Sequence, residues 1–195
     1  MDNKSYQDHF FQKAKDKGYR SRSAFKIIEL DSKFKFLKNG IKLLDVGSFP
    51  GGWAQVSKNK IKNGKILCID KKKIEEVKGT SFITGDFLEE KSKEAIIEYF
   101  NSKIDVILSD MAADTTGNKS LDCIRTNQLC LDVLDFSTRA LNGKGTVVSK
   151  LFMGEDFEKI KTKAKKYFKK IDFFKPKSSR DESRETYIHC SGLST

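Results

Sequence analysis

Residues that build metal centres and disulfide frameworks are scarce in this sequence. Its 195 residues include two histidines and four cysteines, and no two cysteines form a C-x-x-C pair. We therefore expect no metal site, and free cysteines in an intracellular protein. No apolar run approaches the ~18 residues of a membrane span, and the N-terminus lacks the apolar segment of a secretory signal. The expected compartment is the cytoplasm in a bacterium, or a mitochondrion, another organelle or the nucleolus in a eukaryote.

Positive charge is in clear excess, with a net charge of +11 and a pI of about 9.4. The excess lies in residues 1–38 and 160–180, whereas the middle of the chain is near neutral. A basic protein favours a polyanionic partner, with nucleic acid ahead of a membrane surface. If the two basic ends converge in the fold, they form a surface that follows a phosphate backbone.

Short apolar runs alternate with amphipathic segments along most of the chain. The pattern predicts strands at residues 41–47, 65–70, 81–86, 104–110, 146–152, 170–174 and 186–192, and helices at 23–36, 53–61, 91–100, 121–141 and 155–168. Strands that alternate with helices form a parallel sheet covered by helices on both faces.

The C-terminal end departs from that alternation. About ten polar residues join the last two predicted strands, whereas a parallel crossover needs a dozen or more. These two strands should therefore pair antiparallel. We predict a single α/β domain over residues 1–195: a seven-stranded, mostly parallel sheet with one antiparallel strand near the C-terminus. Residues 1–38 are expected to form a basic helical extension packed on it.

The segment "LLDVGSFPGGWAQ", residues 43–55, occupies the first predicted turn from strand to helix. Glycines there let a ligand approach the backbone, and the start of the following helix favours negative charge. The spacing of Gly47, Gly51 and Gly52 is not the G-x-G-x-x-G of dinucleotide-binding folds. NAD is therefore the weaker alternative for the ligand.

Acidic residues end the next two predicted strands. Asp70 is placed to accept hydrogen bonds from both hydroxyls of a ribose. Asp86 can accept from the amino group of an adenine, and Phe87 can pack on its ring. These loops fit an adenosine without a pyrophosphate. We expect S-adenosyl-L-methionine as the cofactor and S-adenosyl-L-homocysteine as the product.

Four charged residues stand in apolar contexts or at strand ends: Lys26, Asp110, Lys150 and Glu185. Lys150 interrupts the apolar run "TVVSKLF", where a lysine loses hydration unless an opposite charge compensates for it. We expect the four to share one cleft beside the cofactor. A lysine that acts as base for methyl transfer to oxygen needs its pKa lowered by about three units from ~10.4. We expect burial and the second cation to lower the pKa of Lys150, while the two acids orient it.

Six motifs, spread in order over roughly residues 13–192, resemble the FtsJ family of RNA 2′-O-ribose methyltransferases. They are "SRSAFK", "DVGSFPGGW", "GDF", "SDMA…TG", "VVSKLFMGE" and "KPKSSRDESRETYI". The resemblance implies a Rossmann-like methyltransferase fold and a catalytic tetrad formed by the four charged residues, with Lys150 as the base. It places the cofactor contacts on Gly51, Trp53, Asp70, Asp86, Phe87 and Asp110. We also expect cofactor contacts at Gly47, Pro50 and Gly52 of the glycine-rich loop.

The sequence differs from the family's pattern at two places. Phe49 stands where a small residue is common, which would reshape the methionine end of the pocket. Ala113 and Asp114 follow "SDMA" where "PN" is common, which adds an acid beside the expected RNA path. The resemblance favours large-subunit ribosomal RNA, at a uridine ribose. Transfer RNA is the alternative, since "KAKDKGYRSRSAFK" is similar to the branch that acts on anticodon loops.

The basic ends supply the candidate RNA contacts, which are Arg20, Arg22, Lys175, Lys177 and Arg180. We expect a monomer whose partner is ribosomal RNA or a pre-ribosomal particle, with no membrane partner. Two other functional classes stay open. A non-catalytic RNA-binding protein on a methyltransferase fold would not bind the cofactor, and an NAD-linked dehydrogenase would need the dinucleotide fingerprint that the loop lacks.

Overall fold

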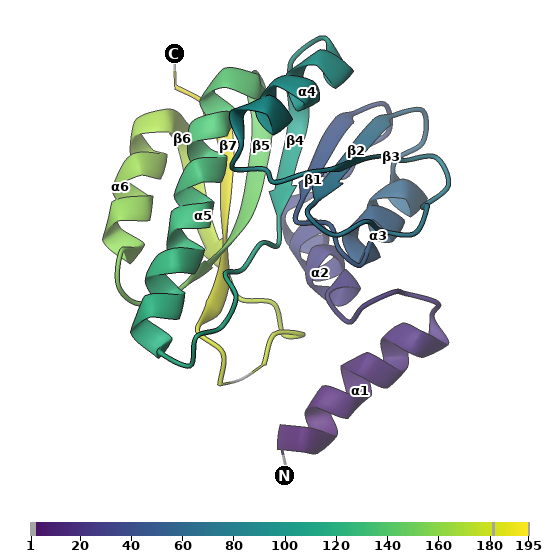
Figure 1. Cartoon of the computed structure of the whole chain (residues 1–195), viewed down its shortest axis with the longest axis vertical. Helices are drawn as coiled ribbons and strands as arrows, with labels where there is room; N and C mark the ends of the chain where they lie inside the picture. The colour runs from purple at the N-terminus through teal and green to yellow at the C-terminus, as the bar shows by residue number, and fades with distance from the viewer. Residues whose placement is uncertain (1–2, 181, 195) are drawn as a thin grey trace.

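The computed structural model describes residues 3–180 and 182–194 (Figure 1). Its strands are β1 (Lys42–Val46), β2 (Lys65–Asp70), β3 (Ser81–Thr84), β4 (Ile104–Ser109), β5 (Leu141–Phe152), β6 (Phe168–Phe174) and β7 (Glu185–Leu193). Its helices are α1 (Asn3–Asp16), α2 (Ala24–Phe34), α3 (Gly52–Lys60), α4 (Glu90–Phe100), α5 (Lys119–Ala140) and α6 (Phe157–Tyr167). Every predicted strand and helix is present, and all but β5 keep their bounds within a few residues.

Strand β5 begins earlier than the sequence indicated. Leu141 directly follows α5 and pairs with Ile104 of β4, whereas the sequence pattern predicted that this strand begins at residue 146. The side-chain amide of Asn142 donates to the carboxylate of Asp105, which holds this start of the strand beside β4. The predicted boundary was wrong because an irregularity in the β4–β5 pairing keeps the glycine-containing chain in the sheet.

The strands form one sheet in the order β3-β2-β1-β4-β5-β7-β6. Strands β1 to β5 are parallel to one another, and β7 runs antiparallel to both of its neighbours, β5 and β6. The predicted fold class is confirmed. In the antiparallel pairing, Phe152 lies opposite Glu185 and Lys150 opposite Tyr187. The reversal therefore brings the start of β7 to the edge where the parallel strands end.

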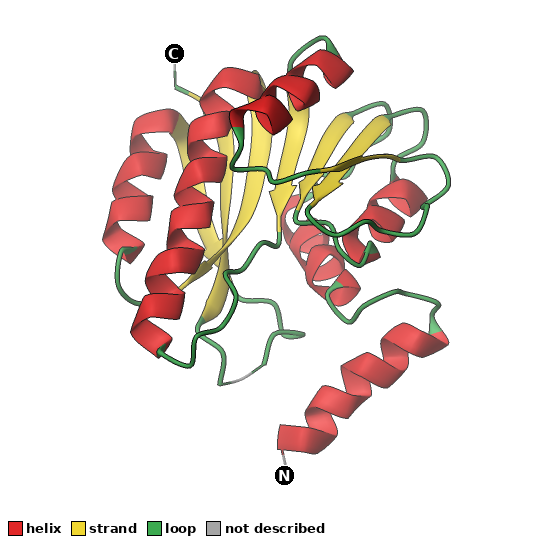
Figure 2. Ribbon diagram, viewed as in Figure 1, coloured by secondary structure: helices red, strands yellow, loops and turns green. Residues whose placement is uncertain are grey.

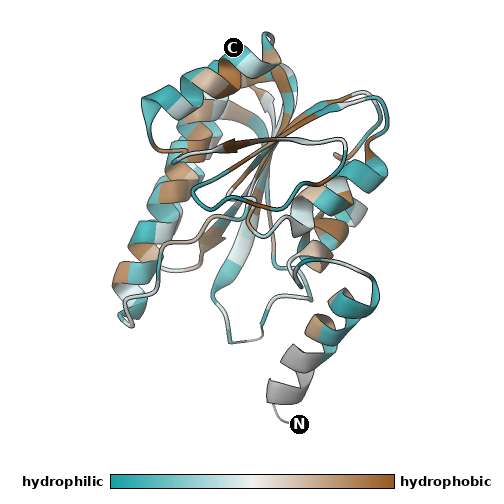
Figure 3. Cartoon of the chain, turned by 45° about the vertical axis from the view of Figure 1, so that its right-hand side comes forward, coloured by the Kyte–Doolittle hydropathy of each residue, from teal (hydrophilic) through white to brown (hydrophobic). Residues whose placement is uncertain are grey.

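Helices cover both faces of the sheet, as Figure 2 shows. On one face, Leu44 and Ile107 belong to a core built with α4, α5 and α6. On the other face, Leu43 and Cys68 pack with residues of α2 and α3, among them Ile27. Neighbouring residues in a strand point to opposite faces, so each strand contributes to both cores. In Figure 3, hydrophobic residues gather on the strands, whereas the helices carry both hydrophilic and hydrophobic residues.

Helix α1 projects from the body of the protein near α2 (Figure 1). The ring of Phe10 lies 5.4 Å from that of Phe25 in α2, and Nζ of Lys13 lies 5.3 Å from the centre of the same Phe25 ring. The N-terminal segment thus contains a helix that contacts the body at α2. No helix within residues 3–180 and 182–194 is long and apolar enough to cross a membrane.

Candidate active site

The carboxyl ends of β1, β2, β3 and β4 meet at one edge of the sheet, where open α/β folds bind ligands. A cavity of about 590 Å³ lies at this edge, and we call it the active cavity. Five of the residues predicted to bind the cofactor line it: Gly47, Asp70, Asp86, Phe87 and Asp110. They follow four different strands, so the sheet brings them together although they are far apart in the sequence.

Four further residues predicted to bind the cofactor are not part of the described lining of the cavity: Pro50, Gly51, Gly52 and Trp53. A side chain at Gly52 would place its Cβ 2.4 Å from Oγ of Ser21, so glycine lets the start of α3 pack against that segment. Trp53 is buried, and its Nε1 donates to the carbonyl of Ser23 at 2.9 Å. These residues have packing roles, and their contact with a cofactor stays a prediction.

Both carboxylate oxygens of Asp70 are held by backbone donors. Oδ2 accepts from the N–H of Phe49 at 3.0 Å, and Oδ1 accepts from the N–H of Lys72 at 2.8 Å. Each oxygen keeps a lone pair for a ribose hydroxyl. The departures from the family's pattern, Phe49 and Asp114, both line the active cavity. The Phe49 ring is half exposed, and its backbone adjoins the residue expected to bind the ribose.

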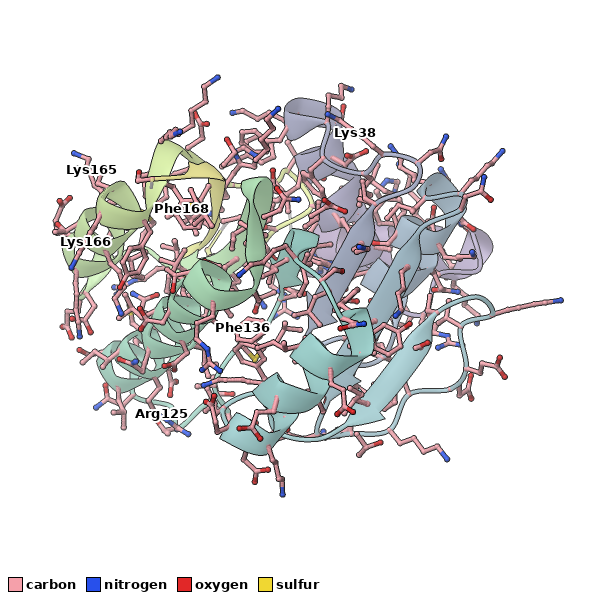
Figure 4. All side chains as sticks on the ribbon, turned by 90° about the horizontal axis from the view of Figure 1, so that it is seen from above. Lys38, Arg125, Phe136, Lys165, Lys166 and Phe168 are labelled. Carbon is pink, nitrogen blue, oxygen red and sulfur yellow. The ribbon has the colours of Figure 1, made fainter. Side chains whose placement is uncertain are left out.

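Asp86 is held ionised by its neighbours. Oδ1 accepts from the N–H of Leu88 at 3.0 Å, and Oδ2 lies 2.9 Å from Nζ of Lys71. Burial raises the pKa of Asp86, but these partners outweigh burial and hold that pKa below its ordinary value. Phe87, the next residue, is 3% exposed and packs edge-on against Phe136 of α5 at 5.3 Å (Figure 4 labels Phe136). Its ring therefore belongs to the core as well as to the cavity wall.

Two joined ion pairs stand at this edge of the sheet. Nζ of Lys150 lies 2.7 Å from Oδ1 of Asp110 and donates to the Asp110 carbonyl at 2.8 Å. Nζ of Lys26 lies 2.7 Å from Oε1 of Glu185. A distance of 3.8 Å between Nζ of Lys150 and Oε2 of Glu185 joins the two pairs. The fold thus brings the four charged residues into one cluster, which we call the tetrad, and its Asp110 also lines the active cavity.

Most of this chain matches one family of known proteins. Residues 19–193 match the family of FtsJ-like methyltransferases. The chain belongs to that family. It is therefore a methyltransferase, and the active cavity and the tetrad are features of a methyltransferase.

Similar proteins match this methyltransferase over nearly its whole length. The ribosomal RNA large subunit methyltransferase E of Pelagibacter ubique is 45% identical over 191 residues, which cover 98% of this chain and 94% of the relative. The protein of the same name from Wolbachia pipientis is 44% identical, over 95% of each chain. A Plasmodium falciparum crystal structure, described as a ribosomal RNA methyltransferase, is 35% identical, with a TM-score of 0.80 over 90% of this chain and 98% of that one.

The electrostatics of the tetrad in this methyltransferase differ from the expectation. Burial lowers the pKa of Lys150, but Asp110 and Glu185 outweigh burial and raise that pKa above its ordinary value. Burial likewise raises the pKa of Asp110. The positive charges of Lys150 and Lys26 outweigh burial, so that this pKa lies below its ordinary value. The prediction of a lowered pKa for Lys150 was wrong for this arrangement, because both acids lie within ion-pair distance of its ammonium.

Tyr187 completes the cluster, although it was not among the residues predicted from the sequence. Its hydroxyl donates to Oδ1 of Asp110 at 2.5 Å and lies 3.5 Å from Oε1 of Glu185. Burial and then the two carboxylates raise the pKa of Tyr187 well above its ordinary value, so the hydroxyl stays a donor. Tyr187 follows Glu185 by two positions in one strand and so faces the same side. That spacing was the signal that could have identified it.

The linker between β6 and β7 is docked on α2. Glu29 accepts from the backbone N–H groups of Lys177 and Ser178 at 2.6 and 3.0 Å, and Nη2 of Arg22 donates to the Ser178 carbonyl at 2.7 Å. Oγ of Ser179 donates to the glutamate of the tetrad at 2.8 Å. The linker that was predicted to contact RNA therefore lies directly beside the tetrad.

The predicted RNA contacts fall into two groups. One group lies in or against this linker: Arg22, Lys175, Lys177 and Arg180. Arg20 is apart from it, because its guanidinium donates to the carbonyls of Glu75 and Glu76 at 2.6 and 2.8 Å. The lysines of α6 lie beyond the opposite face of the sheet from α2. The two basic ends of the sequence therefore converge only through the linker.

Proposed function

We propose that this methyltransferase transfers the methyl group of S-adenosylmethionine to a ribose 2′-hydroxyl of large-subunit ribosomal RNA, at a uridine. The observation that carries the proposal is the tetrad, which adjoins a cavity whose acids suit an adenosine. The names of the relatives from Pelagibacter ubique and Wolbachia pipientis support ribosomal RNA as the substrate. A net charge of +11 suits a polyanionic substrate of this kind.

The residues of the active cavity fit the proposed cofactor, which supplies a methyl group bonded to a positively charged sulfur. Asp70 would accept from the ribose hydroxyls, and Asp86 would accept from the adenine amino group. A side chain at Gly47 would place its Cβ 2.5 Å from Cγ of Met111, so glycine lets Met111 pack closely against this turn in the cavity wall. Asp110 lines the cavity and pairs with Lys150, which connects the cofactor site to the tetrad.

Lys150 has the role of accepting the proton of the 2′-hydroxyl. With its two acidic partners in contact it is charged at neutral pH, so it must lose a proton before it can accept one. A movement that weakens its contact with Asp110 leaves burial as the main influence, and burial lowers the pKa of a lysine. Lys26 and Glu185, paired at 2.7 Å, hold the other side of the hydroxyl's site. Alignment of the hydroxyl with the methyl group contributes the remaining acceleration.

The replacement Lys150→Ala tests this role. We expect methyl transfer from labelled cofactor to ribosomal RNA to fall by at least about 100-fold, the usual contribution of a proton-transfer residue. Cofactor affinity should persist, because Lys150 is not part of the described lining of the active cavity. Lys144→Ala, which removes an exposed lysine of the same strand, serves as the control. Unchanged transfer by the Lys150 variant would exclude Lys150 as the base.

Calorimetry with S-adenosylmethionine distinguishes this proposal from a non-catalytic RNA-binding protein, since that alternative predicts no binding. Mapping of ribose methylation distinguishes large-subunit ribosomal RNA from transfer RNA. We further propose a monomer in which residues 1–195 form a single domain. The bacterial cytoplasm is the proposed compartment, because both relatives named above are bacterial proteins.

A further inference from the structure

A second cavity, of about 290 Å³, lies between the turn at residues 17–20, helix α3 and the segment 76–78. We call it the basic pocket. Four cationic side chains line it, from Lys17, Arg20, Lys58 and Lys78, against the single carboxylate of Glu76. It shares no lining residue with the active cavity in the described part of the chain. It is therefore a separate site, and its charge selects for an anion.

The walls of the basic pocket are tied together by hydrogen bonds. Arg20 donates from its guanidinium to the carbonyls of Glu75 and Glu76, which fixes the turn to the segment behind β2. Gln55 of α3 accepts from the N–H of Arg20 at 2.8 Å and donates to the carbonyl of Gly18 at 3.1 Å. Arg20 therefore connects the turn at residues 17–20 with α3 and with residues 75–76. The pocket is a preformed feature of the fold rather than a chance gathering of mobile side chains.

Within the described part of the chain, the three lysines of the basic pocket have no acidic partner. None of the ion pairs among residues 3–180 and 182–194 includes Lys17, Lys58 or Lys78. Lys58 is half-buried, and its side chain lies over Gly79, where an added Cβ would come within 2.4 Å of its Cε. Gly79 thus leaves room for the Lys58 side chain. The ammonium groups are available to an anionic ligand from outside.

The lining of the basic pocket suits phosphates rather than bases. Tyr19 is its only aromatic residue in the described lining, and that ring packs edge-on against Phe25 at 5.9 Å. Tyr19 is thus the one ring of the described lining on which a base could stack, whereas four cationic side chains face the pocket. Lysines bind phosphate oxygens as point charges, independently of sequence.

One connection, residues 71–80, contributes to both cavities. Lys72 lines the active cavity and Lys78 lines the basic pocket. Six residues of extended chain span at most about 22 Å, so the backbones at these two positions are no farther apart than that. A short stretch of RNA can bridge such a distance.

We propose that the basic pocket binds backbone phosphates of the same RNA whose ribose enters the active cavity. The identity of that RNA rests on the proposed function. The pocket holds the substrate by its backbone without reading its sequence, and it is separate from the linker that contacts the tetrad. Large-subunit ribosomal RNA bound at both places meets the protein at two separate surfaces, which strengthens its binding beside the active cavity.

The triple variant Lys17→Gln, Lys58→Gln and Lys78→Gln tests the proposal in the full chain. The RNA is large-subunit ribosomal RNA from cells that lack the protein. Each lost phosphate contact lowers the slope of log affinity against log salt concentration by about 0.7 to 0.9. We expect the slope to decrease by about 2 and KM for RNA to rise about tenfold. The kcat at saturating RNA and the affinity for S-adenosylmethionine should stay unchanged, because no residue of the active cavity or of the tetrad is altered.

The matched control removes three exposed lysines of α6: Lys159→Gln, Lys165→Gln and Lys166→Gln (Figure 4 labels Lys165 and Lys166). This control lowers the net charge by the same amount as the pocket variant, but on the face of the sheet opposite α3. It should leave the dependence of RNA affinity on salt concentration nearly as in the wild type. A wild-type slope and KM in the pocket variant would overturn the proposal, as would an equal loss in the control. Absence of methyl transfer by the wild type would instead overturn the proposed function, while the binding comparison would still test the pocket.

Discussion

At the scale of single residues, Asp45 shows how burial couples this fold to pH. It lies in β1, is fully buried, and neither carboxylate oxygen has a hydrogen-bond partner among the described residues. Burial, followed by the charges of Asp110 and Asp70, raises the pKa of Asp45 to about 8. In the unfolded chain the pKa is near 3.9. The folded protein therefore keeps a proton that the unfolded chain releases, and stability falls as the pH rises from about 4 to about 8.

The replacement Asp45→Asn removes this proton linkage. We expect the free energy of unfolding at about pH 8 to exceed that of the wild type by up to about 5 kcal/mol, and the difference to vanish toward about pH 4. Urea titrations of both proteins across this range measure it. A difference that does not depend on pH, or one that grows as the pH falls, would contradict the raised pKa.

The pKa of Lys150 makes a second prediction at this scale. Two acids raise the pKa of Lys150, so little of this lysine is neutral at neutral pH. The neutral fraction grows as the pH rises, and the single-turnover rate should grow with that fraction. Glu185→Gln removes one acid, lowers the pKa of Lys150 and should move the midpoint of this rise to lower pH. Glu98→Gln, an exposed change on α4, should leave the midpoint in place. A midpoint that stays or moves upward in the Glu185 variant would refute the assignment.

At the scale of elements, helix α5 holds the end of β5 through one buried amide. Oδ1 of Asn127 accepts from the N–H of Phe152 at 2.8 Å, and Nδ2 donates to the carbonyls of Phe152 and Glu155 at 3.0 and 2.8 Å. The side chain is fully buried. Phe152 lies two positions after Lys150, so this amide fixes the strand that carries the proposed base.

The replacement Asn127→Ala should lower the free energy of unfolding by about 1 to 3 kcal/mol, because it leaves buried backbone groups without partners. It should also lower kcat more than it changes the affinity for the cofactor, since the end of β5 loses its support. Thr138→Ala, an exposed change on the same helix, is the control. Chemical denaturation and methyl-transfer kinetics measure both effects. Wild-type stability and kcat in the Asn127 variant would show that the helix does not position the strand.

The order of elements was predictable because it depends on local patterns. The apolar run of β4 and the amphipathic pattern of α5 are each written in consecutive residues, and the short linker before β7 excluded a parallel crossover. The start of β5 was missed because it depends on pairing with β4 rather than on its own glycines. Local sequence therefore predicts the elements better than the contacts between them.

At the scale of the whole molecule, the site depends on contacts between distant segments. Lys26 and Glu185 are 159 residues apart in the sequence and meet at 2.7 Å because β7 runs back to the edge where β5 ends. The cluster could be expected from family motifs, but the direction of the pKa shift of Lys150 depends on distances that no motif contains. The basic pocket was not expected, since Lys17, Lys58 and Lys78 come from three separate segments.

Ribose methylation of large-subunit ribosomal RNA with Lys150 as the base is tested most directly by mapping 2′-O-methyl groups in cellular RNA. Cells that lack the protein are compared with the same cells complemented with wild type or with Lys150→Ala. We expect one methylated uridine ribose in large-subunit RNA that disappears without the protein, returns with the wild type and stays absent with the variant. An unchanged methylation map in cells that lack the protein, or full restoration by the Lys150 variant, would contradict it.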